Sequence, residues 1–244
     1  MPYYLERVYC IVMAKKSLGV KINDQLHEIN LGYVKVFLIK SKDGFILIDT
    51  GLPNSEKKII SYINSIGKSV SDIKYIILTH SHMDHFGSAY ALQKMSNAHL
   101  GISEKGMLYV DGTKGLLMPV SNSKSVKNNF FVRLLPIIAK FIKPKFIKPD
   151  MKLKEGIFPK EMGINAKIIE TPGHTKDSIS IYLIDSKTAI VGDLMQGTDK
   201  RLELPPFFED YISLINSINK IKELKPDLIC VSHGKDHNVD DIFV

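Results

Sequence analysis

Residues 79–85 read Thr-His-Ser-His-Met-Asp-His, which places three histidines and one aspartate within six consecutive positions. Burying neighbouring imidazole rings costs free energy unless a common partner holds them. Neutral imidazole and carboxylate are the ligands that zinc, iron and manganese prefer in proteins. Catalytic metal sites also keep one coordination position open for water. The segment therefore predicts a metal site that can activate water.

Other histidines and aspartates follow apolar runs elsewhere in the chain. They are Asp49 in Ile-Asp-Thr-Gly, His174 in Pro-Gly-His, Asp193 in Val-Gly-Asp and His233 in Ser-His-Gly. Each apolar run is expected to form a strand, and the adjacent glycine allows the chain to turn sharply where the strand ends. Because sites in open sheets collect outside the strand ends, these residues can converge although they lie far apart in the sequence.

The candidate ligands are more numerous than one four-coordinate ion needs. They are five histidines and two carboxylates: His80, His82, Asp84, His85, His174, Asp193 and His233. This number suits two ions that share a bridging aspartate. The remaining histidines and the two cysteines lack such a setting and are expected to be ordinary residues: His27, His99, His237, Cys10 and Cys230.

The elements that must position these residues can be predicted from hydrophobic periodicity and turn signals. Strands are expected at about 26–30, 33–40, 45–49, 72–80, 98–103, 166–171, 178–184, 188–191 and 228–232, and helices at about 55–67, 86–95 and 211–224. Early hairpins followed by strand–helix–strand units predict an α/β fold with mixed sheets flanked by helices.

The whole chain has an ordinary globular composition, with 244 residues, 44% hydrophobic residues and 24% charged residues. No apolar run approaches the roughly 18 residues that span a bilayer, and no leader pattern is visible at the start. Two cysteines do not make a disulfide framework. We therefore expect a single domain over residues 1–244, located in the cytoplasm.

Together, the segments Ile-Asp-Thr-Gly, Thr-His-Ser-His-Met-Asp-His, Pro-Gly-His, Val-Gly-Asp and Ser-His-Gly resemble the five motifs of the metallo-β-lactamase fold superfamily. The resemblance extends from about Leu26 to His233 and implies a four-layer αββα sandwich with two mixed β-sheets. It also implies a ligand set: His80, His82 and His174 for a first metal, Asp84, His85 and His233 for a second, and Asp193 as the bridge between them. Asp49 would orient a metal-ligating histidine or its loop.

The chemistry implied by this resemblance is hydrolysis by a hydroxide that bridges two divalent ions, with Asp84 receiving or steering a proton. Zinc is the expected metal, and iron and manganese are the alternatives. The substrate can be an ester, a lactone, a thioester or a phosphodiester.

Departures from the patterns of individual subfamilies narrow the range of expected substrates. Asp193 stands where β-lactamases of this fold usually have cysteine, and only 11 residues follow His233, where glyoxalase II enzymes add a glutathione-binding region. Two alternatives stay open. One is an oxidoreductase like the persulfide dioxygenases, with a single iron, and the other is an RNA-processing phosphodiesterase.

The formal net charge of +7 is concentrated in an insert at about 112–150, which contains eight lysines or arginines and no acidic residue between Gly112 and Pro149. Apolar residues at helical spacing within it predict a basic amphipathic helix. Such a helix can be a lid, a homodimer contact, or a peripheral membrane contact through residues 126–146. A small-molecule or lipid-like substrate with an apolar tail is expected. Nucleic acid is not, because aliphatic rather than aromatic residues lie between the basic ones.

Overall fold

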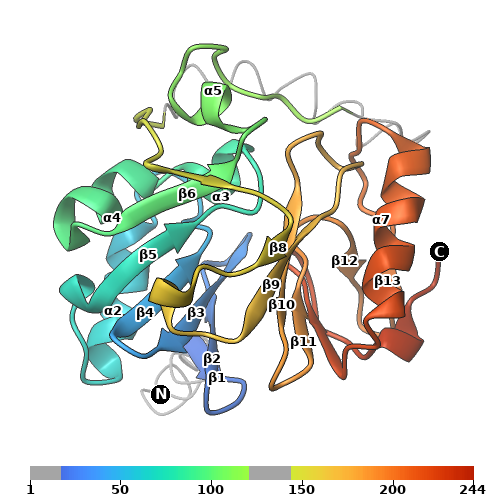
Figure 1. Ribbon diagram of the computed structural model, residues 1–244, viewed down its shortest axis with the longest axis horizontal. Coiled ribbons are helices and arrows are strands. Elements are labelled where there is room, and N and C mark those ends of the chain that lie inside the picture. Colours follow the sequence, from blue (N-terminus) through green and yellow to red (C-terminus); the bar gives the residue numbers. More distant parts are fainter. Residues whose placement is uncertain (1–17, 121–143) are drawn as a thin grey trace, which may run out of the picture.

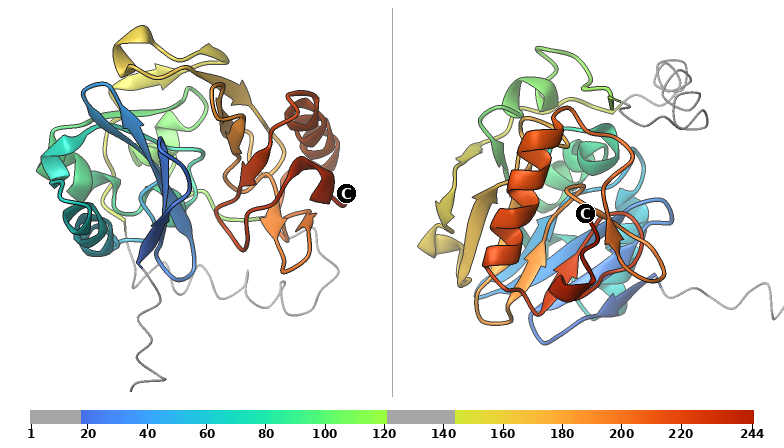
Figure 2. Two further views of the ribbon diagram at one scale, coloured as in Figure 1. Left: turned by 90° about the horizontal axis from the view of Figure 1, so that it is seen from below. Right: turned by 90° about the vertical axis from the view of Figure 1, so that its right-hand side faces the viewer.

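The computed structural model describes residues 18–120 and 144–244. Two β-sheets lie face to face, and helices cover their outer faces (Figure 1). The view from below separates the layers, with α2 and α4 beside the first sheet and α7 on the opposite side of the molecule (Figure 2). This arrangement confirms the predicted four-layer αββα sandwich with two mixed sheets.

The first sheet has seven strands in the order β1-β2-β3-β4-β5-β6-β7. They are β1 (Gly19–Lys21), β2 (Leu26–Asn30), β3 (Lys35–Ser41), β4 (Gly44–Ile48), β5 (Ile73–Ile77), β6 (His99–Ser103) and β7 (Met151–Leu153). Neighbours from β1 to β4 are antiparallel, and neighbours from β4 to β7 are parallel. Antiparallel hairpins therefore give way to parallel crossovers within one sheet, as the order of elements in the sequence predicts.

The second sheet has five strands in the order β14-β11-β10-β9-β8. They are β8 (Gly156–Ile157), β9 (Ala166–Glu170), β10 (Ile179–Leu183), β11 (Thr188–Ile190) and β14 (Leu228–Cys230). Only the β11–β14 pair is parallel. Strands β12 (Gln196–Gly197) and β13 (Leu202–Glu203) form a separate small hairpin.

Of the described helices, α2 and α7 have ten or more residues and the others are shorter. The helices are α2 (Glu56–Ser65), α3 (Met83–Phe86), α4 (Ala89–Ser96), α5 (Met107–Val110) and α7 (Tyr211–Glu223), with single 3₁₀ turns η1 (Val70–Asp72), η2 (Lys160–Met162) and η3 (Val239–Asp241).

Alternating side chains of the inner strands fill different cores. In β3, Val36 and Leu38 pack beneath α2 and α4, whereas Phe37 and Ile39 point between the two sheets. This follows from the two-residue period of a strand, and it explains why β3 reads as a continuous apolar run: both of its faces are buried. A third core lies between the second sheet and the inner face of α7.

The predicted helix over 86–95 is wrong in its boundaries. The chain forms two helices there, α3 and α4, separated at residues 87 and 88. Gly87 lies so close to Pro53 that a Cβ on it would come within 2.5 Å of the proline ring. The break places Asp84 and His85 in α3, at the end of the sheet, instead of in a loop before a longer helix.

The described parts of the predicted insert, 112–120 and 144–150, contain no helix. Its centre, residues 121–143, lies outside the described residues, as does most of the segment 126–146 considered for membrane contact. Cys10 also lies outside them. Within the part of the chain that the structure describes, no helix is long and apolar enough to cross a membrane.

Candidate metal centre

The candidate ligands gather at one edge of the two sheets because they follow strand ends directly or, for Asp84 and His85, lie in the short helix α3 after β5. Asp49 follows β4, His80 and His82 follow β5, and His174, Asp193 and His233 follow β9, β11 and β14 in turn. The backbone joins the sheets at this edge. Ile179 N–H donates to Thr79 C=O at 2.9 Å, and Lys35 N–H donates to Ser232 C=O at 2.9 Å. Residues far apart in the sequence are thereby held in one place.

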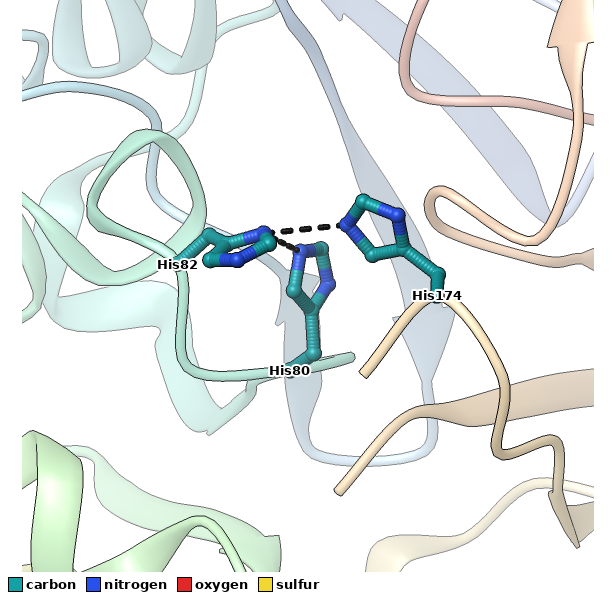
Figure 3. Close-up of side chains that lie close together, drawn as sticks. All are labelled: His80, His82 and His174. Carbon is teal, nitrogen blue, oxygen red and sulfur yellow. Dashed lines mark hydrogen bonds between the residues drawn. The ribbon is translucent and has the colours of Figure 1, made fainter. Parts of the chain in front are cut away.

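Three histidines point their ring nitrogens at a common position (Figure 3). His82 Nδ1 lies 3.1 Å from His80 Nε2 and 2.9 Å from His174 Nε2. The three rings are nearly perpendicular to one another, with interplanar angles of 81°, 84° and 88°. We call these three residues the histidine triad.

The outer nitrogens of the triad fix which inner atoms carry lone pairs. His174 Nδ1 lies 2.6 Å from the Phe207 carbonyl oxygen, which can only accept, so the proton is on Nδ1 and Nε2 carries a lone pair. Thr79 Oγ1 donates to Asp49 and therefore accepts from His80 Nδ1–H at 3.1 Å. His80 Nε2 thus also carries a lone pair. A single hydrogen on His82 Nδ1 can serve only one of these two lone pairs.

Burial keeps the triad neutral. Burial, together with His174, lowers the pKa of His82 to about 3, and burial also lowers the pKa of His80 and His174. Three uncharged imidazoles whose lone pairs converge are the donor set that a divalent ion takes in proteins.

A second group lies beside the triad and contains both carboxylates. His85 Nε2 is 3.3 Å from Asp193 Oδ1 and 3.9 Å from Asp84 Oδ2. His233 Nε2 is 3.4 Å from Asp84 and 3.4 Å from Asp193. Asp193 also reaches the triad, since its Oδ2 lies 3.5 Å from His174 Nε2. Asp193 therefore stands between the two groups.

The carboxylates of Asp84 and Asp193 favour positive charge on the histidines of this second group. Burial opposes charging of His233, yet Asp193 and Asp84 raise its pKa to about 11. The pKa of His85 is likewise raised against the effect of burial, by Asp193, Asp49 and Asp84. Protons or a metal cation can supply that charge, and a metal would take the place of the protons.

Asp49 orients His85, a member of the second group, through a hydrogen bond to its outer ring nitrogen. Its carboxylate is buried and accepts three hydrogen bonds, each of 2.8 Å, from Thr79 N–H, Thr79 Oγ1–H and His85 Nδ1–H. Its backbone has a φ of 62°, in the left-handed region that aspartate tolerates better than most residues. Such outer hydrogen bonds fix the tautomer and direction of a metal-binding imidazole.

The fit to a metal can be tested on buried polar atoms. His85 Nε2 and Asp193 Oδ1 are buried 3.3 Å apart, and neither has a partner with hydrogen-bond geometry among the described residues. Buried polar atoms without a hydrogen-bond partner are uncommon in folded proteins because they cost free energy. Both face the space between the histidines and carboxylates, and a bound cation satisfies both. The residues present therefore fit a metal centre.

The structure thus brings together all eight residues named from the sequence: the seven candidate ligands and Asp49. The other three histidines lie elsewhere with partners of their own. His27 Nδ1 pairs with the Tyr62 hydroxyl, His99 lies beside Asp150, and His237 Nε2–H donates to the Thr198 carbonyl.

Sequence reasoning missed the residues that support the ligands. Thr79 holds Asp49 and His80, Phe207 supplies a carbonyl to His174, and the Tyr33 carbonyl accepts from His233 Nδ1–H at 3.0 Å. Two of these three contributions are made by backbone atoms, so residue type carries no signal for them. Thr79 precedes the first histidine, and its hydroxyl was the one available sign.

The amino-acid sequence is similar to those of known proteins over most of its length. A sequence model of the metallo-beta-lactamase superfamily matches residues 29–233. The Bacillus subtilis protein YobT is 30% identical over 213 residues, covering 83% of each chain. The probable metallo-hydrolase YflN of Bacillus subtilis is 24% identical, over 92% of this chain and 89% of its own. The hydroxyacylglutathione hydrolase GloC of Haemophilus influenzae is 32% identical over 67% of this chain and 69% of its own.

Solved structures agree in fold. A metallo-beta-lactamase from Cronobacter sakazakii superposes with a TM-score of 0.66 at 21% identity, over 91% of this chain and 80% of that one. The B3 metallo-beta-lactamase BLEG-1 gives 0.66 at 18% identity, over 88% and 95% of the two chains. At these identities the likeness concerns the fold alone.

Proposed function

The chain belongs to the metallo-beta-lactamase superfamily of hydrolases, and we propose that it cleaves a carboxylic ester or thioester with two divalent metal ions. His80, His82 and His174 would hold one ion. Asp84, His85 and His233 would hold the other, and Asp193 lies between the two groups. The observation that carries the proposal is the convergence of imidazole lone pairs with two buried, unpartnered atoms, His85 Nε2 and Asp193 Oδ1.

Divalent ions bound at such a site lower the pKa of a water molecule to about 7 and polarise a carbonyl oxygen. The chain's own residues prepare the site for this chemistry. Asp49 and Thr79 accept the outer N–H of His85 and of His80, so the inner nitrogen of each ring is the one that would face a metal. Asp84 lines the cavity above the site, as Asp193 does, so it can accept a proton from water or deliver one to a leaving group.

Zinc is the proposed metal, because a set of imidazole and carboxylate ligands with an open position is typical of catalytic zinc. A thioester is favoured by the similarity to GloC, whose name assigns it to hydroxyacylglutathione hydrolysis. β-Lactam hydrolysis is not proposed, because Asp193 occupies the position at which β-lactamases of this fold usually carry cysteine.

The test is hydrolysis of thioester and ester panels by the purified protein as isolated, after chelation, and after zinc is restored. We expect activity that disappears with chelation and returns with zinc. His82→Ala should abolish it, whereas His99→Ala, at an exposed histidine outside the site, should not.

Two results would contradict the proposal. The first is activity that survives removal of the metal. The second is oxygen consumption with a persulfide, or cleavage of RNA, in place of ester and thioester hydrolysis.

A further inference from the structure

A cavity of about 550 Å³ lies directly over the metal centre. His82, His174, Asp193 and His233 line its floor, and Asp84 lies beside them. A volume of this size is within the range that holds small-molecule ligands. The cavity is therefore where a substrate must enter to reach the ions.

The walls of this cavity are apolar. One wall is the segment 116–119, Leu-Leu-Met-Pro, and another is the segment 205–207, Pro-Pro-Phe. Met195 and Leu52 also line the cavity. Both wall segments are irregular loops, so their side chains rather than a sheet or helix surface define the shape of the cavity.

Along the part of the cavity that the described residues form, the charged side chains lie on the floor. Among the described residues that line the cavity there is no lysine or arginine, and the only carboxylates are Asp84 and Asp193. A charged group on the substrate that lay against the walls would lose hydration and gain no partner there. An apolar group would instead remove its own surface and that of the walls from water.

Each wall is attached to a histidine of the metal centre. His174 Nδ1–H donates to the carbonyl of Phe207, and His82 and Leu117 form a β-bridge. At the rim, His233 Nδ1–H donates to the carbonyl of Tyr33, whose ring also packs edge-on against His233 with the ring centroids 4.9 Å apart. The positions of the walls and of the ligands are therefore coupled, so that a group bound between the walls is held in a fixed relation to the ions.

We infer that the substrate carries an uncharged, apolar acyl group that binds between residues 116–119 and 205–207 while its carbonyl lies over the metal centre. This rests on the proposed function and specifies its substrate class. A glutathione thioester fits the described part of this cavity less well, because its charged groups would meet the apolar residues 116–119 and 205–207.

The first experiment measures kcat/KM of the zinc-loaded protein on straight-chain thioesters with acyl groups of two to twelve carbons. We expect an increase of about fourfold for each added methylene until the cavity is full. Leu117→Asn should flatten this dependence, with a loss that grows with chain length. Leu108→Asn, at an exposed leucine outside the cavity, should leave the dependence unchanged.

The inference is overturned if kcat/KM is flat or falls with chain length. It is also overturned if S-lactoylglutathione is a better substrate than the neutral medium-chain thioesters. Hydrolysis with either of these results would leave the proposed function standing.

A second experiment does not depend on catalysis. Titration calorimetry of the zinc-loaded protein with 2-butanone, 2-octanone and 2-undecanone measures binding of apolar groups with a carbonyl that is not cleaved. Tighter binding with length, weakened by Leu117→Asn but not by Leu108→Asn, supports the inference even if no thioester is cleaved. Equal or undetectable binding of all three ketones overturns it.

Discussion

Replacing Asp49 by asparagine should weaken one of the two metal positions much more than the other. The carboxylate accepts three hydrogen bonds of 2.8 Å, two at Oδ2 and one at Oδ1. Asparagine offers a single acceptor oxygen. Because Thr79 N–H can only donate, that oxygen must stay at Oδ1, and the NH₂ group then faces His85 Nδ1.

This change reverses the tautomer of His85. With a donor opposite Nδ1, the ring proton moves to Nε2, the atom that faces Asp193 at 3.3 Å and the proposed metal. A protonated nitrogen is not a metal ligand. Loss of such an outer partner costs roughly 10- to 100-fold in metal affinity, which corresponds to about 1.4–2.8 kcal/mol. His174 keeps its own outer partner, the Phe207 carbonyl, and His82 is not bonded to Asp49. His80 is affected only indirectly, because Thr79 Oγ1 loses its acceptor at Oδ2 and no longer fixes the His80 tautomer. The triad should therefore lose less metal affinity than the second group.

The assay is competition with a chromophoric zinc chelator, which resolves two dissociation constants. In Asp49→Asn one of the two constants should rise by roughly 10- to 100-fold, and the other should change less. Asparagine tolerates the φ of 62° at this position, so the backbone should not be strained. Asp43→Asn, on an exposed turn, is the matched control. Two unchanged constants, or equal weakening of both in a folded variant, would refute this reasoning.

Three further predictions concern stability. Ile181→Ala, in the core between the sheets, should lower the free energy of unfolding by about 2–5 kcal/mol in urea denaturation; a change well below this range would show that the core there is loosely packed. Lys35 is buried between Glu28 and Asp236, so Lys35→Met leaves two carboxylates without their cation. The substitution should lower the free energy of unfolding by about 3–5 kcal/mol, and an unchanged free energy of unfolding would contradict this. Burial raises the pKa of Asp177, so its ionisation opposes folding: its contribution to stability is present below the unfolded-state pKa and is lost as the pH rises through the folded pKa. In thermal unfolding, the stability of Asp177→Asn relative to the wild type should therefore increase as the pH rises from 3 to 7. A difference that stays constant over this range would contradict the raised pKa of Asp177.

Much of the fold was predictable because its inner strands are buried on both faces. The apolar runs of β3, β4 and β5 stand out in the sequence, and the hairpin turn at residues 42–44 fixes the pairing of the first two. The short strands β1, β7, β8, β12 and β13 were not predicted. With two or three residues each, they have no periodicity to read, and they exist because a neighbouring strand offers hydrogen bonds.

The ligands were predictable for a different reason. A functional histidine or aspartate beside glycine at a strand end is visible as a residue type, and parallel strands bring such ends to one edge of a sheet. The walls of the cavity were not predictable. Residues 116–119 and 205–207 carry ordinary apolar residues in irregular segments, and only tertiary contacts with His82 and His174 bring them over the site. The break between α3 and α4 was missed because Gly87 is required by the approach of Pro53, which is distant in the sequence.

The metal content of the purified protein, measured by elemental mass spectrometry, shows whether the site holds two metal ions. We expect about two zinc ions per chain in the wild type, and a loss of metal in His82→Ala that does not occur in His99→Ala. No bound metal after reconstitution with zinc, manganese or iron would contradict this expectation, and a single iron per chain would replace the hydrolase with an iron-dependent oxidoreductase.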